Sequence, residues 1–511
     1  MSSHNGEWKK ITPKFNSLPV HTALLHTGKV LTFGGSGNEP KKLHDWYSPE
    51  IYEPDFTGAT DGTIRQITNE GIEGDLFCVG HAYLPDGKLF LAGGTFLYDG
   101  LGVLPIAFPP FWGLEHTYTF DPDTEKFTRL PNMKYGRWYP TCVMLANGKI
   151  ATFAGLSKWP PWVYQPVNEI YNSQNNTWQN IKGGNNPMPL YPRMHLLPDG
   201  ELFYAGSYNT HMTFPFARWG FKIATFNFEQ QKWKHLEHPE NMHRQEGSTV
   251  MLPLLLDNDY QAEIILIGGG DMNANATETC EKISFGSGIT PKYVPVESMH
   301  NPRYYVYPVI LPDRNILVVG GKTGHIDHSI HHMCHELAPG ELDHDQSAVL
   351  ETELYNTETG EWSSLEYMTI DRLYHSNAIL LPDGKVMTMG SNPTRKCVEK
   401  RIEVFSPPYL FNGNRPKIID VKSVLNHGES FEIEMRDNSE IKDASLIRPS
   451  NTTHCLNPEQ RYVELDTTQN AEKITATIPN RTNVVPPGYY MLFVRNQNGV
   501  PCVAPFVKIL L

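Results

Sequence analysis

Three kinds of feature are scarce in this chain of 511 residues, and each absence excludes a class of protein. Basic residues are outnumbered, with 43 Lys and Arg against 56 Asp and Glu, for a net charge of −13. This balance disfavours nucleic acid and anionic membrane surfaces as partners, because both are bound through a basic face. No apolar run approaches the roughly 20 residues that a membrane span needs. We therefore expect a protein that binds neither nucleic acid nor membrane.

Cysteine is the third scarce feature, and its seven copies are scattered without a Cys-x-x-Cys pair. An odd number leaves at least one thiol outside any disulfide scheme. The opening residues, MSSHNGEWKK, lack the apolar core of a signal peptide. Either the protein stays inside the cell or the sequence lacks its leader, so the compartment stays open.

Glycine and proline are abundant, and the chain repeats internally. An apolar strand, a tight turn, a second apolar strand and small residues recur seven times, at a spacing of about 50 to 70 residues that is typical of kelch-type blades. Asp-Gly or Asn-Gly turns join the two strands in several copies, as in β-hairpins. The copies span residues 21–35, 78–94, 139–155, 191–206, 248–269, 305–321 and 374–390.

Second hairpins lie between these copies, each with an aromatic on one strand and Trp178, Trp233 or Trp362 on the next. Two hairpins make a four-stranded blade, and seven blades close a ring without exposed edges. After SPPYLFNGNRPKI the pattern changes to short strands with a turn about every ten residues, which is typical of an immunoglobulin-like sandwich. The sequence thus predicts an all-β protein, with a seven-bladed kelch-type β-propeller over residues 1–414 and a sandwich over 415–511.

The repeats place chemically reactive side chains at one shared position. Counting back six residues from Leu84, Leu145 and Leu381 leads to Cys78, Tyr139 and His375, with Tyr374 one residue earlier. The same position holds Tyr191 and Tyr305 in two other copies. Equivalent positions lie at one height around the channel of a propeller, so these side chains should converge.

A thiol, phenols and an imidazole in one place indicate a metal and redox site. Nitrogen and phenolate oxygen ligands in a square array favour Cu(II). Because copper transfers one electron at a time, a two-electron oxidation requires a second redox group. A tyrosine bonded through its ring to a cysteine sulfur could hold a radical and supply that group.

Longer motifs make the resemblance specific. The segments DLFCVG, GRWYPT, DRLYHSNAILLPDGKV, NTTHCLNPEQR and PPGYYMLFVRNQNGVP follow one another along nearly the whole chain. With them the chain resembles the copper-radical oxidases of the galactose oxidase and glyoxal oxidase family, whose C-terminal sandwich is of the early-set type. The motifs RWYP, SNP and FSPPYL resemble the glyoxal oxidase branch more closely.

The resemblance implies a mononuclear copper site with a self-processed Tyr–Cys cofactor. It implies that Tyr139, cross-linked to Cys78, is an equatorial ligand and the radical site, and that His375 and His454 are the other equatorial ligands. Tyr374 would be the axial ligand and take the proton of the substrate hydroxyl. The implied activity is the oxidation of a hydrated aldehyde or primary alcohol by O2, with release of hydrogen peroxide. Such enzymes are usually exported, and we expect this one to be a monomer.

Further roles follow from the same resemblance. An aromatic stacked over the cross-linked tyrosine is expected in AGLSKWPPW, at Trp159 or, failing that, Trp162. Arg193 in LYPR is a candidate to orient the substrate or to support a ligand, and Tyr305 is a candidate of the same kind.

Two alternatives remain open from the sequence. The first is a non-catalytic kelch propeller that binds protein or glycan, since one fold serves many functions. The second concerns the insertion at residues 325–335, whose histidines are spaced three and four apart. It would be a second metal site or copper-delivery loop, or a solvated loop over the substrate entrance, and we favour the loop. The histidines are His328, His331, His332 and His335.

Overall fold

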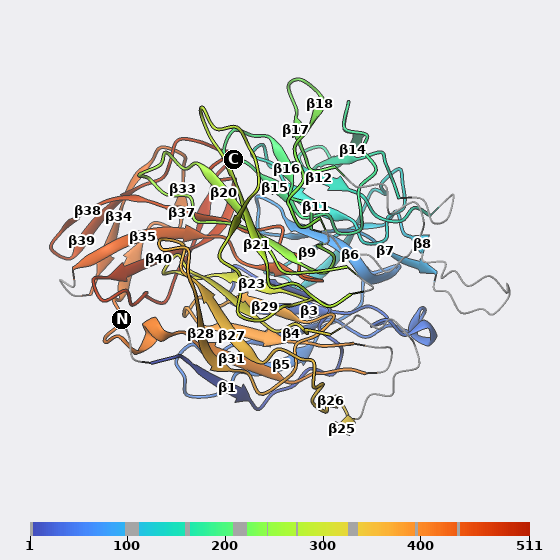
Figure 1. Ribbon diagram of the computed structural model, residues 1–511, viewed down its shortest axis with the longest axis horizontal. Coiled ribbons are helices and arrows are strands. Elements are labelled where there is room, and N and C mark those ends of the chain that lie inside the picture. The colour runs from blue at the N-terminus through green and yellow to red at the C-terminus, as the bar shows by residue number, and fades with distance from the viewer. Residues whose placement is uncertain are drawn as a thin grey trace.

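The chain folds into β-sheets in the parts that the computed structural model describes, and all pairs of neighbouring strands are antiparallel there except the parallel pair of β33 and β41 (Figure 1). These parts are residues 4–97, 112–158, 164–207, 222–242, 244–271, 274–324, 336–393, 397–436 and 440–511. Their helical elements are two short 3-10 turns, η1 (Pro40–Lys42) and η2 (Pro408–Phe411). Within the described residues, no helix has the length and apolar character required to cross a membrane.

Seven sheets, each with a run of four antiparallel strands, follow one another along the described chain before residue 407. The first three contain β2 (His21–Leu24), β3 (Val30–Phe33), β4 (Glu50–Glu53) and β5 (Thr63–Gln66); β6 (Asp75–Tyr83), β7 (Leu89–Leu97), β9 (Thr117–Asp121) and β10 (Lys126–Leu130), with β8 (Trp112–Gly113) beside β7; and β11 (Thr141–Met144), β12 (Ile150–Phe153), β13 (Glu169–Asn172) and β14 (Thr177–Asn180).

The next four sheets repeat this plan. They contain β15 (Met194–Leu196), β16 (Leu202–Tyr204), β17 (Ala224–Asn227) and β18 (Lys232–His235); β19 (Ser248–Met251), β20 (Ala262–Ile267), β21 (Cys280–Phe285) and β22 (Val294–Val296); β23 (Tyr307–Ile310), β24 (Ile316–Val319), β27 (Glu351–Tyr355) and β28 (Trp362–Tyr367); and β29 (Asn377–Leu380), β30 (Val386–Met389), β31 (Ile402–Ser406) and β1 (Glu7–Ile11). A small hairpin of β25 (Glu336–Ala338) and β26 (Glu341–Leu342) stands apart.

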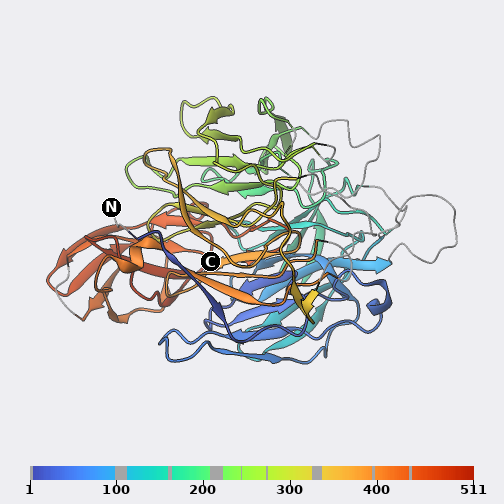
Figure 2. The same ribbon diagram turned by 60° about the horizontal axis from the view of Figure 1, so that its bottom comes forward.

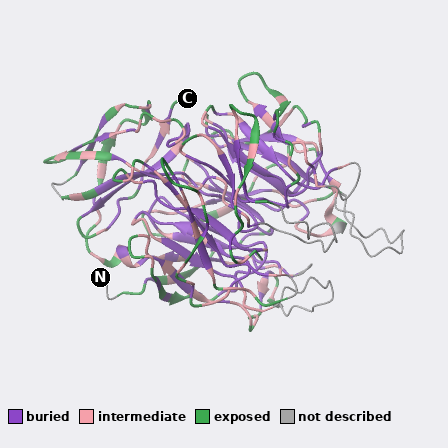
Figure 3. Ribbon diagram, turned by 45° about the horizontal axis from the view of Figure 1, so that its top comes forward, coloured by how far each residue is buried: buried purple, intermediate pink, exposed green. Residues whose placement is uncertain are grey.

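The first strand of each sheet faces a common axis, so the sheets form a ring. Neighbouring first strands contact one another: β6 contacts β11, and β29 contacts β2. Side chains join two further pairs: His21 Nδ1 lies 3.0 Å from His81 Nε2, and His195 Nε2 lies 2.8 Å from Thr249 Oγ1. These inner strands are buried, while the outer strands carry most of the exposed residues (Figure 3). This is the β-propeller expected from the repeats.

The ring is closed by the N-terminal strand, a feature that the repeats did not predict. Strand β1 supplies the outer strand of the last sheet, pairing with β31 from Glu7 opposite Ser406 to Ile11 opposite Ile402. Trp8 adds a side-chain bond, donating from Nε1 to Thr352 Oγ1 at 3.0 Å. The two ends of the propeller are therefore joined through a shared sheet.

The repeated turns owe their shape to glycine. In the second sheet, Leu84 N donates to Lys88 O at 2.8 Å and Gly87 N donates to Leu84 O at 2.9 Å. Gly87 has φ = 93°, a conformation that residues with a Cβ rarely adopt. Because the turn fixes the end of each inner hairpin, it also fixes which residue stands six positions earlier, at the opposite end of the strand.

The C-terminal residues form two sheets that pack together on the turn side of the ring (Figure 1, Figure 2). Ala504 N donates to Pro382 O at 2.8 Å, and Leu254 N donates to Tyr462 O at 3.0 Å. The predicted boundary at residue 414 stays a prediction. The sheets contain β32 (Ile418–Val421), β34 (Ser430–Met435), β39 (Lys473–Thr477) and β38 (Asp466–Asn470), and β33 (Val424–Leu425), β41 (Phe506–Ile509), β40 (Gly488–Asn496), β35 (Ile441–Ile447) and β37 (Tyr462–Glu464).

One segment of this C-terminal part enters the ring. Strand β36 (Asn451–Thr452) pairs with β2 and so joins the first propeller sheet. Thr453 Oγ1 then donates to Val20 O at 3.0 Å. The residue after Thr453 is His454, which therefore reaches the axis from the C-terminal side.

Candidate metal centre

The residues at the repeated position share an unusual backbone conformation. The φ angles are 64° at Cys78, 63° at Tyr139, 43° at Tyr191, 58° at Tyr305 and 62° at His375. Left-handed φ is uncommon for residues other than glycine and marks strain that the surrounding structure must hold. Backbone bonds link neighbouring members: Tyr139 N donates to Cys78 O at 3.1 Å, and Tyr191 N donates to Tyr139 O at 2.9 Å. We call these equivalent positions the axial belt.

Buried ion pairs explain how several belt residues keep this conformation. An arginine stands two residues before Tyr139 and Tyr305, and each arginine is paired with a glutamate on the third strand of its own sheet. Both pairs are fully buried, with Arg137 to Glu169 at 2.9 Å and Arg303 to Glu353 at 2.6 Å. Removing one member would leave an unpaired charge, which is costly, so the chain before each belt residue is firmly placed.

Three potential metal ligands converge inside the belt. The ligand atoms of Cys78, His375 and His454 all lie within 4.8 Å of one another, and all three residues are buried. The Tyr139 and Tyr374 hydroxyls are hydrogen-bonded to each other beside them. Ring centroids lie 4.7 Å apart for Tyr139 and His454, and 4.5 Å apart for the two histidines. The structure thus brings together all five residues expected to form the centre.

The His375 imidazole is oriented by Asn392. Nδ1 lies 3.1 Å from Asn392 Oδ1, while Asn392 Nδ2 donates to Cys397 O at 2.6 Å. Since Oδ1 can only accept, His375 carries its proton on Nδ1 and keeps the lone pair on Nε2. Nε2 is buried and has no hydrogen-bond partner among the described residues. Burial lowers the pKa of His375 to about 3, opposed by the Asn392 bond, so the ring is neutral near pH 7.

The His454 imidazole is oriented in the same way by its neighbour. Thr453 Oγ1 lies 2.6 Å from His454 Nδ1. Because the threonine hydroxyl donates its proton to Val20 O, it accepts the proton of Nδ1. The lone pair of His454 is therefore on Nε2, which lies 3.9 Å from Cys78 Sγ. Asn392 and Thr453 were not identified from the sequence, although Asn392 lies within the SNP motif.

Cys78 and Tyr139 are in contact. Burial raises the pKa of the Cys78 thiol, and its hydrogen bond with Tyr139 opposes that increase. Burial likewise raises the pKa of Tyr139, and the nearby Cys78 and Tyr374 add to it. Cys78 N donates to His21 Nε2 at 3.1 Å, which helps to hold the cysteine in its left-handed conformation.

The other predicted residues fall into three groups. Arg193 is buried behind His454 and donates to the carbonyls of Tyr191, Gly247 and His454 at 2.7, 3.1 and 2.9 Å. Of its two expected roles, this placement fits support of a ligand. Tyr305 is buried with its ring 5.4 Å from that of Tyr374. Trp159, Trp162 and the histidines of 325–335 lie outside the described residues.

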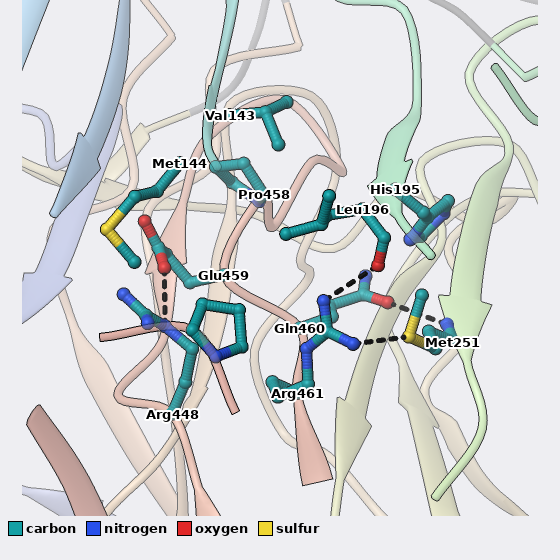
Figure 4. Close-up of a pocket in the computed structure, with 11 residues that line it drawn as sticks. Val143, Met144, His195, Leu196, Met251, Arg448, Pro458, Glu459, Gln460 and Arg461 are labelled. Atoms are coloured by element: carbon teal, nitrogen blue, oxygen red, sulfur yellow. Dashed lines mark hydrogen bonds and ion pairs between the residues drawn. The ribbon is translucent and has the colours of Figure 1, made fainter. Parts of the chain in front are cut away.

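The loop that carries His454 is anchored beneath the site by a third buried ion pair. Arg448 Nε lies 2.7 Å from Glu459 Oε2, and Glu459 also accepts a bond from Tyr83 N at 2.8 Å. Arg461 Nη2 donates to Leu196 O at 2.8 Å. Arg448, Glu459, Arg461 and Leu196 line a small pocket between the loop and the inner strands (Figure 4). The anchor joins the loop to β6 and β15, the inner strands of the second and fourth sheets.

This anchor yields a stability prediction. Glu459→Leu should lower the free energy of unfolding by about 3–5 kcal/mol, because it leaves the Arg448 charge buried without its partner. Urea unfolding followed by circular dichroism measures the change. Arg448→Met combined with Glu459→Leu removes both charges and should recover much of the loss. A double variant as unstable as the sum of its two single variants would show that the ion pair is not the anchor.

Comparison with known proteins identifies the family. The model "Glyoxal oxidase N-terminus" matches residues 57–409, and the model "Galactose oxidase-like, Early set domain" matches residues 415–509. The first match covers more than half of the chain, so the chain belongs to the glyoxal oxidase family. The resemblance drawn from its motifs is confirmed.

Curated relatives span almost the whole chain. It is 28% identical to "Aldehyde oxidase GLOX" of Vitis pseudoreticulata, over 99% of this chain and 97% of that protein. It is 26% identical to "Galactose oxidase" of Gibberella zeae, over 96% of this chain and 69% of that protein. A solved structure of a fungal alcohol oxidase of the AA5 family, in complex with copper, has a TM-score of 0.79 at 23% identity and covers 99% of this chain and all of its own. This likeness confirms the fold.

Proposed function

We propose that the protein is a copper-radical oxidase that oxidises a hydrated aldehyde or a primary alcohol with O2. An alcohol RCH2OH and O2 would give RCHO and H2O2, and a hydrated aldehyde RCH(OH)2 would give RCOOH and H2O2. Family membership and the names of the relatives support this reaction class. The partners are then a small substrate and O2, and we propose that the protein acts as a monomer.

One observation carries the proposal: two imidazoles and two phenols meet in a buried site, and a hydrogen bond at Nδ1 of each imidazole leaves Nε2 as the ligand atom. Ligating histidines are held in this way in metal sites. Two imidazole nitrogens and a phenolate oxygen suit Cu(II). His375, His454, Tyr139 and Tyr374 would hold the ion.

Each residue of the chain then has a task. Copper, when bound, would polarise the substrate hydroxyl and accept one of the two electrons. Tyr374 would take the proton of that hydroxyl, because its own hydroxyl lies in the centre and is hydrogen-bonded to that of Tyr139. Tyr139, as its radical, would take one hydrogen atom from the substrate carbon, which carries the second electron together with a proton.

The contact of Cys78 with Tyr139 supports a thioether between them. Its formation removes the thiol hydrogen and one ring hydrogen, makes one S–C bond and transfers two electrons and two protons to O2, giving H2O2. The sulfur would delocalise the unpaired electron of Tyr139. Such a cofactor needs copper and O2 and no other protein.

The experiment is peroxide release from protein loaded with copper and exposed to air, tested on glyoxal, methylglyoxal, galactose, glycerol and simple alcohols. The proposal expects release with at least one aldehyde or alcohol, and none from protein stripped of copper by a chelator. Absence of peroxide from a copper-loaded, cross-linked protein would favour the non-catalytic propeller instead.

The orientation of His454 gives a second test. Thr453→Val keeps the shape of the side chain but removes the oxygen that accepts the Nδ1 proton, and should weaken copper binding about 10- to 100-fold. Thr453→Ser keeps the hydroxyl and should stay within a few-fold of wild type. Competition with a copper chelator measures both affinities, and equal affinities of Val and Ser variants would contradict the assigned role.

A further inference from the structure

A glutamate occupies one position of the axial belt. Counting back six residues from Leu252 leads to Glu246, in a copy whose inner turn is replaced by a longer connection, residues 252–261. Glu246 has φ = 54°, like the other belt residues. Arg244 stands two residues earlier and pairs with Glu281 at 2.6 Å, as the equivalent arginines pair in other sheets. Tyr305 N donates to Glu246 O at 2.8 Å, which places Glu246 next to Tyr305 in the belt.

Glu246 adjoins the part of the belt that holds Tyr305. It is fully buried. Burial raises the pKa of both Tyr374 and Tyr305. The negative charge of the Glu246 carboxylate raises the pKa of each further. The rings of those two tyrosines lie 5.4 Å apart. A buried glutamate next to Tyr305, whose ring neighbours that of Tyr374, is therefore placed near the group proposed to receive the substrate proton.

We propose that Glu246 determines specificity, because its carboxylate can accept a hydrogen bond from the second hydroxyl of a hydrated aldehyde whose first hydroxyl is bonded to Tyr374. This inference rests on the proposed oxidase function and names its preferred substrate class. A carboxylate accepts hydrogen bonds and donates none when ionised, which matches a hydroxyl that keeps its proton throughout the reaction.

The chemistry balances without a further reactant. In RCH(OH)2, the first hydroxyl gives its proton to Tyr374, the carbon gives up its hydrogen, and O2 accepts the two electrons and two protons as H2O2. The second hydroxyl becomes the hydroxyl of RCOOH. A primary alcohol has hydrogen in place of this hydroxyl. The alcohol therefore gains no hydrogen bond to Glu246, although its binding still removes water from the Glu246 carboxylate. For this reason the site discriminates against the alcohol.

The test uses two substrates that differ by one hydroxyl group. Hydrated methylglyoxal, CH3COCH(OH)2, and hydroxyacetone, CH3COCH2OH, share the same skeleton. Initial rates of peroxide release give kcat/KM for each. We expect the aldehyde-to-alcohol ratio to fall about 100-fold in Glu246→Met, which removes the acceptor, and about 10-fold in Glu246→Gln, which retains a neutral one. Glu361→Gln, at an exposed position, should leave the ratio unchanged.

Binding provides a readout that is independent of turnover. The dissociation constants of the two compounds are measured on copper-loaded protein without O2. The preference for the hydrated aldehyde that they give should fall in the Glu246 variants by the same factors as the kcat/KM ratio. An unchanged ratio in both Glu246 variants would overturn the proposal. Wild-type protein that oxidises alcohols and not hydrated aldehydes would overturn it too, while leaving the oxidase function intact. Absence of peroxide from every substrate would refute the oxidase function and this inference with it.

Discussion

Replacing Cys78 with serine is expected to reduce peroxide release at least about a thousandfold, or ~4 kcal/mol in the activation barrier, while copper remains bound. The thioether cannot form without the sulfur, so the site keeps its ligands and loses the group proposed to stabilise the Tyr139 radical. Serine is close to cysteine in size and the position is fully buried, so the fold should be retained. Peroxide assays and copper content measure the two effects separately.

Cys142 provides the matched control. It is a buried free cysteine on β11, three residues after Tyr139, and its Sγ lies 3.6 Å from Thr152 Oγ1. Cys142→Ser should keep nearly full activity, because this thiol is not part of the proposed cofactor. A Cys78→Ser variant that turns over at the wild-type rate would refute the cofactor, even if copper binds.

Replacing His454 with alanine is expected to have the largest effect on the metal. Loss of a ligand should weaken copper binding by more than the 10- to 100-fold that follows loss of an orienting partner. Peroxide release should fall with copper occupancy. Competition with a chelator measures the affinity, and the unfolding midpoint of the metal-free protein shows whether the fold is retained.

Cys455→Ser tests whether any change in this loop would have the same result. Cys455 is buried, shares the left-handed turn at φ = 60° and follows His454 directly. The Cys455→Ser variant should retain copper affinity within a few-fold of wild type. Equal losses of copper affinity in His454→Ala and Cys455→Ser would mean that the loop shapes the site without supplying a ligand to the metal.

The repeats were enough to predict the fold and much of the centre. Tight turns with a Gly such as Gly87 fix the length of each inner hairpin, so counting along the sequence corresponds to moving around the ring. That relation alone predicts that Cys78, Tyr139 and His375 meet at one height of the channel. It holds because the turns and the buried arginine–glutamate pairs are local and recur from sheet to sheet.

Residues outside the regular repeat could not be found by counting. His454 is placed by β36, a two-residue strand that pairs with β2 more than 400 residues earlier, and only the family resemblance pointed to it. Glu246 was missed although it keeps the phase, because its copy has no short turn and a carboxylate is not an expected ligand type. Strand β1 carries no repeat motif, so the repeats could not predict how the ring closes.

Intact mass tests the central claim most directly. Metal-free protein prepared without O2 is compared with the same protein after addition of copper and air, and peptide mapping locates any change. The account predicts a mass lower by two hydrogens, located in a linked pair of peptides that contain Cys78 and Tyr139, and no such change in Cys78→Ser. An unchanged mass in copper-loaded, aerated wild-type protein would contradict it.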